Sequence, residues 1–80
     1  MSTITTETVE QVIYQALESF GADPSEFSHD TTFVQLDIDS LDLAELSQVV
    51  EEQCGVLLRS EDMKRIKTIG DAIATICDKA

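Results

Sequence analysis

A single serine stands where one helical pattern is expected to begin, and an aspartate directly precedes it. The triplet is Asp39-Ser40-Leu41. A hydroxyl at a helix entrance is exposed, and the backbone N–H groups and the helix dipole at that end favour a nearby phosphodiester. A serine beside an aspartate at a helix start is also a common N-cap, and capping alone would favour that purely structural role. The triplet therefore has two interpretations, a site of covalent modification or an N-cap.

The rest of the chain offers little for catalysis of its own. His29 is the only histidine, and without a GxSxG turn it makes no hydrolytic triad with Ser40. Cys54 and Cys77 are too few and too far apart for a disulfide scaffold, and they lack zinc-site spacing. So short a chain also has little room for a preformed pocket with converging polar groups. We therefore expect a protein that is not an enzyme.

Carboxylates close to the serine begin a pattern that resembles a calcium-binding loop. Asp37 and Asp39 occupy the first two ligand positions of such a loop. The third ligand position is Leu41, the position that requires glycine is Asp42, and the twelfth is Gln48 instead of glutamate. The pattern is therefore not an EF-hand, and no metal site is expected.

Charge is distributed very unevenly along the chain. Sixteen acidic and five basic residues give a net charge of −11, and residues 1–58 contain no lysine or arginine. Such a negative surface repels nucleic acid and anionic membranes and attracts basic protein surfaces. We therefore expect basic-surfaced protein partners, no nucleic acid and no membrane. The basic residues are Arg59, Lys64, Arg65, Lys67 and Lys79.

The first half of the chain is expected to form one amphipathic helix followed by a long loop. The helix begins near Thr5 or Thr6 and ends at about Phe20, where Gly21 stops it. Turn and capping residues dominate positions 22–39. Loops of this length are unusual in small domains unless they are functional or pinned, so we expect an ordered loop. The apolar residues expected to pin it to the core are Phe27, Phe33, Val34, Leu36 and Ile38.

The second half is expected to contain three helices. The first of them spans about residues 40–53 and ends at Gly55. Ser60 is expected to cap the short turn of helix that follows it. The last helix begins at Thr68, with Asp71 three residues on in a capping-box arrangement.

These elements predict an all-α protein, a four-helix bundle with a long first loop and a short third helix. It is expected to form a single domain over residues 1–80. No apolar run approaches the roughly 18 residues that a membrane span requires, and the N-terminus lacks the basic start and apolar stretch of a signal peptide. We therefore expect a cytoplasmic monomer.

Several segments taken together resemble acyl carrier proteins. The resemblance rests on the segment from Leu36 to Leu46, on Gly55 and on residues 67–73, and it covers about residues 5–78. It implies an acyl-carrier-type bundle in which Ser40 is esterified with 4'-phosphopantetheine from coenzyme A by a phosphopantetheinyl transferase. Asp39 and Leu41 would flank that attachment site.

The resemblance also implies roles for two further sets of residues. Partner enzymes such as a ketosynthase and an acyltransferase would bind the second helix and the short third helix. The growing acyl chain would retreat between the helices. The implied partner-binding residues are Asp42, Glu45, Glu51, Glu52, Lys64 and Arg65, and the implied acyl-chain pocket is formed by Leu46, Val50, Ile66 and Ile73.

Departures from the family pattern bear on the pathway. Asp37 stands in the short segment before the Asp-Ser pair, where the family often has glycine. The third helix, commonly acidic in fatty-acid carriers, holds Lys64 and Arg65. These differences favour a stand-alone carrier for polyketide biosynthesis. The alternatives are a carrier for housekeeping fatty-acid synthesis and, from a different class, an unmodified acidic helical adaptor; a peptidyl carrier fits the acidic surface less well.

Overall fold

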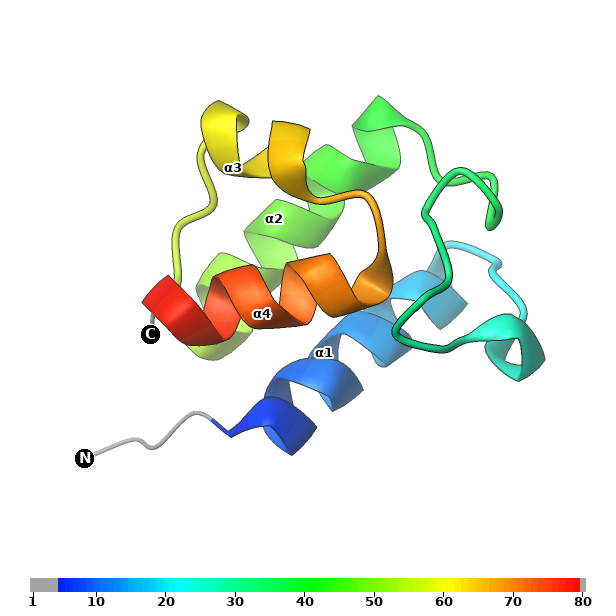
Figure 1. The fold of residues 1–80 in the computed structure, drawn as a ribbon, viewed down its shortest axis with the longest axis horizontal. Coiled ribbons are helices and arrows are strands. Elements are labelled where there is room, and N and C mark those ends of the chain that lie inside the picture. The colour runs from blue at the N-terminus through cyan, green and yellow to red at the C-terminus, as the bar shows by residue number, and fades with distance from the viewer. Residues whose placement is uncertain (1–4, 80) are drawn as a thin grey trace.

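The protein is helical throughout its regular parts (Figure 1). The computed structural model describes residues 5–79; residues 1–4 and 80 of the expected domain lie outside the described residues, as does most of the N-terminal start at which no signal peptide is expected. Within the described range the only β feature is an isolated bridge between Thr32 and Thr68. The expected all-α class, long first loop and short third helix are confirmed. The elements are α1 (Thr6–Ser19), a 3₁₀ turn η1 (Pro24–Glu26), α2 (Ser40–Cys54), α3 (Ser60–Arg65) and α4 (Ile69–Lys79).

The core lies between α1, α2 and α4. α1 packs against both α2 and α4 and crosses beneath them in the view of Figure 1, whereas α3 lies over the first half of α2. None of the helices within residues 5–79 combines the length and the apolar character that crossing a bilayer requires. The largest fully buried side chains are all aliphatic: Val9, Ile13, Leu17, Leu46, Val50, Ile69 and Ile76.

Local capping explains where α1 and α2 begin and end. The Thr5 hydroxyl oxygen accepts a hydrogen bond from the Thr8 N–H at 3.2 Å and so caps α1. Gly55, with φ of 70°, closes α2 in the left-handed conformation that favours glycine. Gly21, with φ of 97°, follows α1 in the same way. These boundaries agree with the sequence prediction to within one residue at each end.

Capping at α3 differs from the prediction, and capping at α4 confirms it. Ser60 is the first residue of α3 and not its cap; the N-cap position is Arg59, whose N–H donates to the Asp62 carboxylate at 2.9 Å. The acidic side chain in the first turn thus satisfies the N–H that precedes it. At α4, the Asp71 N–H donates to the Thr68 hydroxyl at 3.0 Å while the Thr68 N–H donates to the Asp71 carboxylate at 3.1 Å.

The long first loop is held against the start of α4 by main-chain hydrogen bonds. This arrangement confirms that the loop is ordered, although the 3₁₀ turn within it was not predicted. Pairing with α4 satisfies backbone groups that have no partner inside the loop itself. The bonds run from Gly70 N–H to His29 O (2.9 Å), from Ile69 N–H to Thr31 O (2.9 Å) and from Phe33 N–H to Lys67 O (3.0 Å).

Gly70 permits the closest part of this contact. A Cβ at this position would lie 2.7 Å from the carbonyl oxygen of His29, and a backbone atom cannot swing aside. The His29 ring adds a second attachment, because its Nε2 lies 2.9 Å from the carboxylate of Glu10 on α1. His29 is thus a loop residue, as expected, and it joins the loop to both α1 and α4.

Most of the apolar loop residues anchor the loop as expected. Phe33, Leu36 and Ile38 are buried, and Phe27 is half-buried with its ring centroid 5.0 Å from that of Tyr14. The prediction is wrong for Val34, whose side chain is 83% exposed. The reason is a tight turn that the Ile38 N–H closes by donating to the Phe33 carbonyl at 2.9 Å, which leaves Val34 on its outer side.

Candidate functional site

The start of α2 divides capping and chemistry between two adjacent residues. The Asp39 carboxylate accepts a hydrogen bond from the Asp42 N–H at 3.0 Å, so Asp39 is the N-cap. Ser40 is the first residue of the helix and is exposed. Among residues 5–79 its hydroxyl has no hydrogen-bond partner. The N-cap interpretation of Ser40 is therefore wrong, and its hydroxyl is free for another role.

The backbone that leads to Ser40 turns sharply at Asp37. Asp37 has φ of 58° and is the only non-glycine residue with positive φ in the described part of the chain. Its neighbours Leu36 and Ile38 are both buried, whereas Asp37 itself is exposed. The turn therefore lets two apolar side chains enter the core on either side of a residue that faces solvent. This is the position at which the sequence carries aspartate where glycine would fit best.

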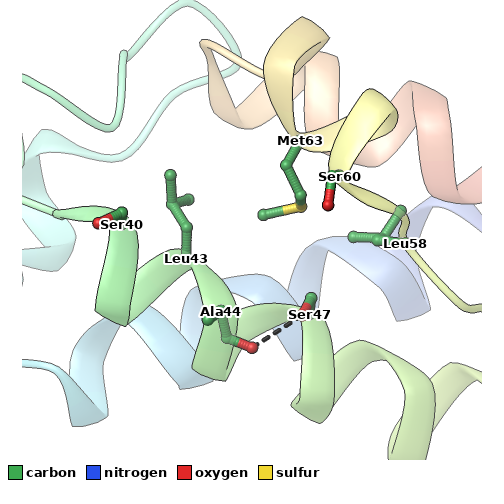
Figure 2. Close-up of a pocket in the computed structure, with 7 residues that line it drawn as sticks. All are labelled: Ser40, Leu43, Ala44, Ser47, Leu58, Ser60 and Met63. Atoms are coloured by element: carbon green, nitrogen blue, oxygen red, sulfur yellow. Dashed lines mark hydrogen bonds between the residues drawn. The ribbon is translucent and has the colours of Figure 1, made fainter.

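A groove of about 300 Å³ opens beside Ser40, between α2 and α3 (Figure 2). Figure 2 shows Leu43 and Ser47 along α2, with Met63 and Ser60 facing them from α3. The lining contains both apolar and hydroxylated side chains. The full lining consists of Ser40, Leu43, Ala44, Ser47, Leu58, Ser60 and Met63.

A second cavity, of about 390 Å³, shares Leu43 with the groove. It lies between the long loop, the start of α2 and the segment after α3, and it is more apolar. Leu43 therefore lies between the two hollows, of which only the groove is lined by Ser40. Besides Leu43 the second cavity is lined by Thr32, Phe33, Val34, Ile38, Ile66 and Lys67.

Three of the four residues implied as an acyl-chain pocket lie outside these two cavities. Leu46, Val50 and Ile73 are buried in the core and line neither cavity, while Ile66 is buried and lines the second one. The sequence analysis missed Leu43, Ala44 and Ser47. Their spacing of three, four and seven residues from Ser40 places them on the same helix face and would have identified them. Leu58 and Met63 give no such signal, because their position depends on how α3 folds over α2.

The acidic residues of α2 face solvent without a basic partner. Glu45, Glu51 and Glu52 are exposed and Asp42 is half-buried. The ion pairs within residues 5–79 join Glu10 to His29 and Asp62 to Lys79, so none involves α2. Lys64 and Arg65 on α3 are exposed as well. Next to Ser40, the Leu41 side chain is 75% exposed.

Perturbed pKa values lie at helix caps and in the core, away from Ser40. Hydrogen bonds from the Lys67 and Thr68 N–H groups lower the pKa of Asp71. The pKa of Asp62 is lowered by the hydrogen bond from the Arg59 N–H and then by Lys79. Burial, and then Cys77, raises the pKa of the Cys54 thiol, which keeps that thiol protonated and unreactive. Asp62 and Asp71 lie at the starts of α3 and α4, and Cys54 is the last residue of α2.

Comparison with known sequences bears directly on this arrangement. The family described as "Phosphopantetheine attachment site" matches residues 10–76. The chain belongs to the acyl carrier protein family. Domains of this family carry a covalently attached 4'-phosphopantetheine. Members of the family are carriers and not catalysts, and they work with synthase enzymes.

Individual acyl carrier proteins resemble this chain over 60 residues, or 74% of its length. It is 42% identical to "Acyl carrier protein" of Rhodococcus erythropolis and covers 66% of that protein. It is 40% identical to "Meromycolate extension acyl carrier protein" of Mycobacterium tuberculosis and covers 52% of that protein. It is also 40% identical to the protein of the same name from Mycolicibacterium smegmatis and covers 61% of it. The matched region thus spans between half and two thirds of these relatives.

The residues at the start of α2 fit a phosphopantetheine group. Ser40 offers an exposed hydroxyl that no other described residue engages, because Asp39 carries out the capping. The adjoining groove provides space for a flexible chain that starts at this point. The arrangement is therefore chemically suited to an ester at Ser40 and leaves the helix cap intact.

Proposed function

We propose that this protein is an acyl carrier in which Ser40 bears the phosphopantetheine arm, with Asp39 and Leu41 flanking it. One observation carries the proposal: the Ser40 hydroxyl is exposed at the first position of α2 while Asp39 caps the helix. When bound, the arm supplies a terminal thiol that holds an acyl chain as a thioester. The chain's own residues supply the Ser40 hydroxyl and the Asp39 cap that leaves it free.

Attachment is a phosphoryl-group substitution in which Ser40 is the nucleophile. The Ser40 oxygen forms a bond to the pantetheine-bearing phosphorus of coenzyme A, and the bond from that phosphorus to the adenosine bisphosphate half breaks. The Ser40 proton passes to a base of the transferase, since the described residues near Ser40 include no histidine or amine. The N–H groups of the first turn of α2 and the helix dipole at that end would favour the phosphodiester.

Partner enzymes are proposed to dock on the surface around Ser40. A phosphopantetheinyl transferase, a ketosynthase and an acyltransferase would each bring a basic surface to Asp42, Glu45, Glu51 and Glu52. Exposed Leu41 adds an apolar contact beside the arm. The absence of ion-pair partners for these carboxylates within residues 5–79 supports such a role.

The pathway has two candidates. Exposed Lys64 and Arg65 on α3 support a dedicated polyketide-type synthase, whose surface would meet a third helix of mixed charge instead of an acidic one. The relatives named "Meromycolate extension acyl carrier protein" favour the alternative, a carrier for fatty-acid synthesis. We favour the polyketide-type synthase and a cytoplasmic, monomeric carrier.

Intact mass with peptide mapping tests attachment. The protein is incubated with coenzyme A, magnesium and a broad-specificity phosphopantetheinyl transferase, alongside Ser40→Ala and the matched control Ser47→Ala. Wild type and Ser47→Ala should each gain one phosphopantetheinyl group, at Ser40, and Ser40→Ala should gain none. A folded wild-type protein that gains nothing would overturn the carrier function and favour an unmodified acidic adaptor.

Reaction with fatty-acid elongation enzymes separates the two pathways. The loaded protein should react more slowly with a fatty-acid ketosynthase than that enzyme's own carrier does. The double variant Lys64→Glu/Arg65→Glu should react faster than wild type, because it restores an acidic third helix. Equal rates for wild type and the enzyme's own carrier would favour the fatty-acid pathway.

A further inference from the structure

Positive charge is concentrated in one short segment at the end of α3. Lys64 and Arg65 are the last two residues of that helix, and Lys67 follows after Ile66. Ile66 is buried and fixes the segment to the core, whereas the three basic side chains around it are exposed. We call Lys64, Arg65 and Lys67 the basic cluster.

The acidic residues of α3 and of the start of α4 leave the basic cluster without an ion pair. Asp62 pairs with Lys79 at 2.9 Å, and Asp71 accepts hydrogen bonds from the two N–H groups that precede α4. Glu61 is exposed and, like the cluster itself, is in no ion pair within residues 5–79. Salt screens the more distant carboxylates, since the Debye length is about 8 Å at physiological ionic strength. The cluster therefore stays locally positive although the net charge of the protein is −11.

An exposed apolar side chain accompanies the basic cluster. Val34 is 83% exposed, and it lines the second cavity together with Lys67. That cavity shares Leu43 with the groove that Ser40 lines. In Figure 1 the end of α3 likewise lies over the first half of α2. Val34 and the basic cluster are therefore neighbours of the modification site and not remote surface features.

The surfaces on the two sides of the groove carry charges of opposite sign. α2 contains four acidic residues and no lysine or arginine, whereas the end of α3 presents the basic cluster. A uniformly basic partner surface would be attracted by α2 and repelled by the cluster. A surface that is basic opposite α2 and acidic opposite the cluster would be attracted by both, and in one orientation only.

We propose that the basic cluster and Val34 form a second docking surface, which binds an acidic protein surface that presents an apolar side chain to Val34. The inference rests on the proposed function, because this acidic surface would belong to a synthase enzyme whose basic residues meet α2 in the same complex. The opposite charges would then fix the orientation in which Ser40 approaches that enzyme. They would also disfavour enzymes that are basic throughout.

The test is a titration of the protein with two short synthetic peptides, monitored by backbone amide chemical shifts. In one peptide glutamates flank a pair of leucines, and in the other lysines replace the glutamates. The glutamate peptide should shift the amides of Val34 and of residues 64–67, and the lysine peptide those of residues 42–52. Both effects should weaken as salt is added.

Variants make the test specific. The first combines Lys64→Gln, Arg65→Gln and Lys67→Gln. It should bind the glutamate peptide about tenfold more weakly, because each exposed charge pair contributes only modestly, and it should bind the lysine peptide no less tightly than wild type does. Val34→Ser should weaken binding of the glutamate peptide by a smaller factor. The matched controls are Arg59→Gln and Leu57→Ser, which replace an exposed cation and an exposed apolar residue outside both cavities and should bind as wild type does.

Three results would overturn the proposal. They are no shift at the basic cluster with the glutamate peptide, undiminished binding in the triple variant, and binding to phosphatidylglycerol vesicles that the triple variant abolishes, which would make the cluster a membrane site. Loading of the arm is measured separately by intact mass. A protein that fails to load at Ser40 contradicts the proposed function, whereas a protein that loads but does not bind the glutamate peptide contradicts only the second docking surface.

Discussion

The long first loop and helix α3 flank Leu43 from two sides, and they are held in opposite ways. The loop has almost no regular structure, yet Phe33, Leu36 and Ile38 are buried and main-chain hydrogen bonds join it to α4. α3 is a regular helix, yet none of its residues is buried. Its one ion pair within residues 5–79 is partly exposed and joins Asp62 to Lys79 at 2.9 Å.

This contrast shows that regular secondary structure and firm anchoring are separate properties. An element with few buried contacts opens at a lower free-energy cost than one that is buried and hydrogen-bonded. The long first loop is therefore the firmly held side of the site. The position of α3, which is held less firmly, sets the width of the groove between α2 and α3. Substitutions on the two sides should differ in their effect on stability.

The largest effect is expected for Gly70→Ala. The new Cβ would meet the His29 carbonyl oxygen at 2.7 Å and push the loop away from α4. We expect a loss of roughly 1–3 kcal/mol in the free energy of unfolding, measured by urea denaturation. The control is Ala74→Gly at an exposed position of the same helix, which measures how much the difference in helix propensity between alanine and glycine contributes. Wild-type stability in Gly70→Ala would mean that the loop is held no more firmly than α3.

A smaller loss is expected for Thr31→Val. The buried Thr31 hydroxyl donates to the Glu26 carbonyl at 2.7 Å, and valine removes that bond while keeping the shape. The cost should be about 1 kcal/mol, and the amides of Ile69 and Gly70 should exchange with solvent faster. Thr75→Val, which removes no hydrogen bond among residues 5–79, serves as the control. Unchanged exchange at these amides would show that the loop contact does not depend on Thr31.

Asp39→Ala tests whether Asp39, and not Ser40, caps the start of α2. Loss of the bond to the Asp42 N–H should cost about 1 kcal/mol. Ser40→Ala should leave thermal stability almost unchanged, because Ser40 caps nothing. Thermal unfolding measures both variants. A larger loss of stability in Ser40→Ala than in Asp39→Ala would mean that Ser40, and not Asp39, caps α2.

Asp37→Gly should raise stability instead of lowering it. Glycine adopts the φ of 58° without steric cost, and the gain should reach up to about 1 kcal/mol after the entropy of glycine in the unfolded chain is subtracted. Asp30→Gly, another exposed loop aspartate and one without positive φ, should not stabilise. A less stable Asp37→Gly variant would show that the carboxylate itself contributes to the turn.

The smallest effect is expected for Asp62→Asn on α3. Because folding lowers the pKa of Asp62, its contribution is present at neutral pH and is lost as the pH falls below the ordinary aspartate value of about 4 towards the folded-state pKa. Urea midpoints measured from pH 7 to pH 3 should therefore fall less steeply in the variant. The ion pair to Lys79 is partly exposed, so solvent screening limits the effect. If Asp62→Asn lost more unfolding free energy at pH 7 than Thr31→Val does, α3 would be held more firmly than the long first loop.

Local signals in the sequence were sufficient for most of the fold. Gly21 and Gly55 mark left-handed helix ends, and the Thr68 and Asp71 pair marks a helix start through reciprocal hydrogen bonds that depend only on their spacing. Capping of α3 was not predictable in this way. A serine before a helical turn normally indicates the cap, whereas here the helix begins one residue earlier and Asp62 provides the acceptor.

The candidate site was predictable on α2 and not across from it. Ser40, Leu43 and Ser47 share a face by helix periodicity alone. Met63 and Leu58 reach the groove only because α3 folds back over α2, and Val34 is exposed only because a hydrogen-bonded turn directs it outward. Such contacts depend on tertiary geometry, which residue periodicity does not contain.

The concentration of negative charge before residue 59 also has a kinetic consequence. Long-range attraction raises the rate at which a basic partner finds this surface, and added salt lowers that rate. Charged side chains that stay solvated, such as Glu45, Glu51 and Glu52, add few short-range contacts that would slow separation. Encounters of this kind form quickly and end quickly, which suits the proposed carrier function.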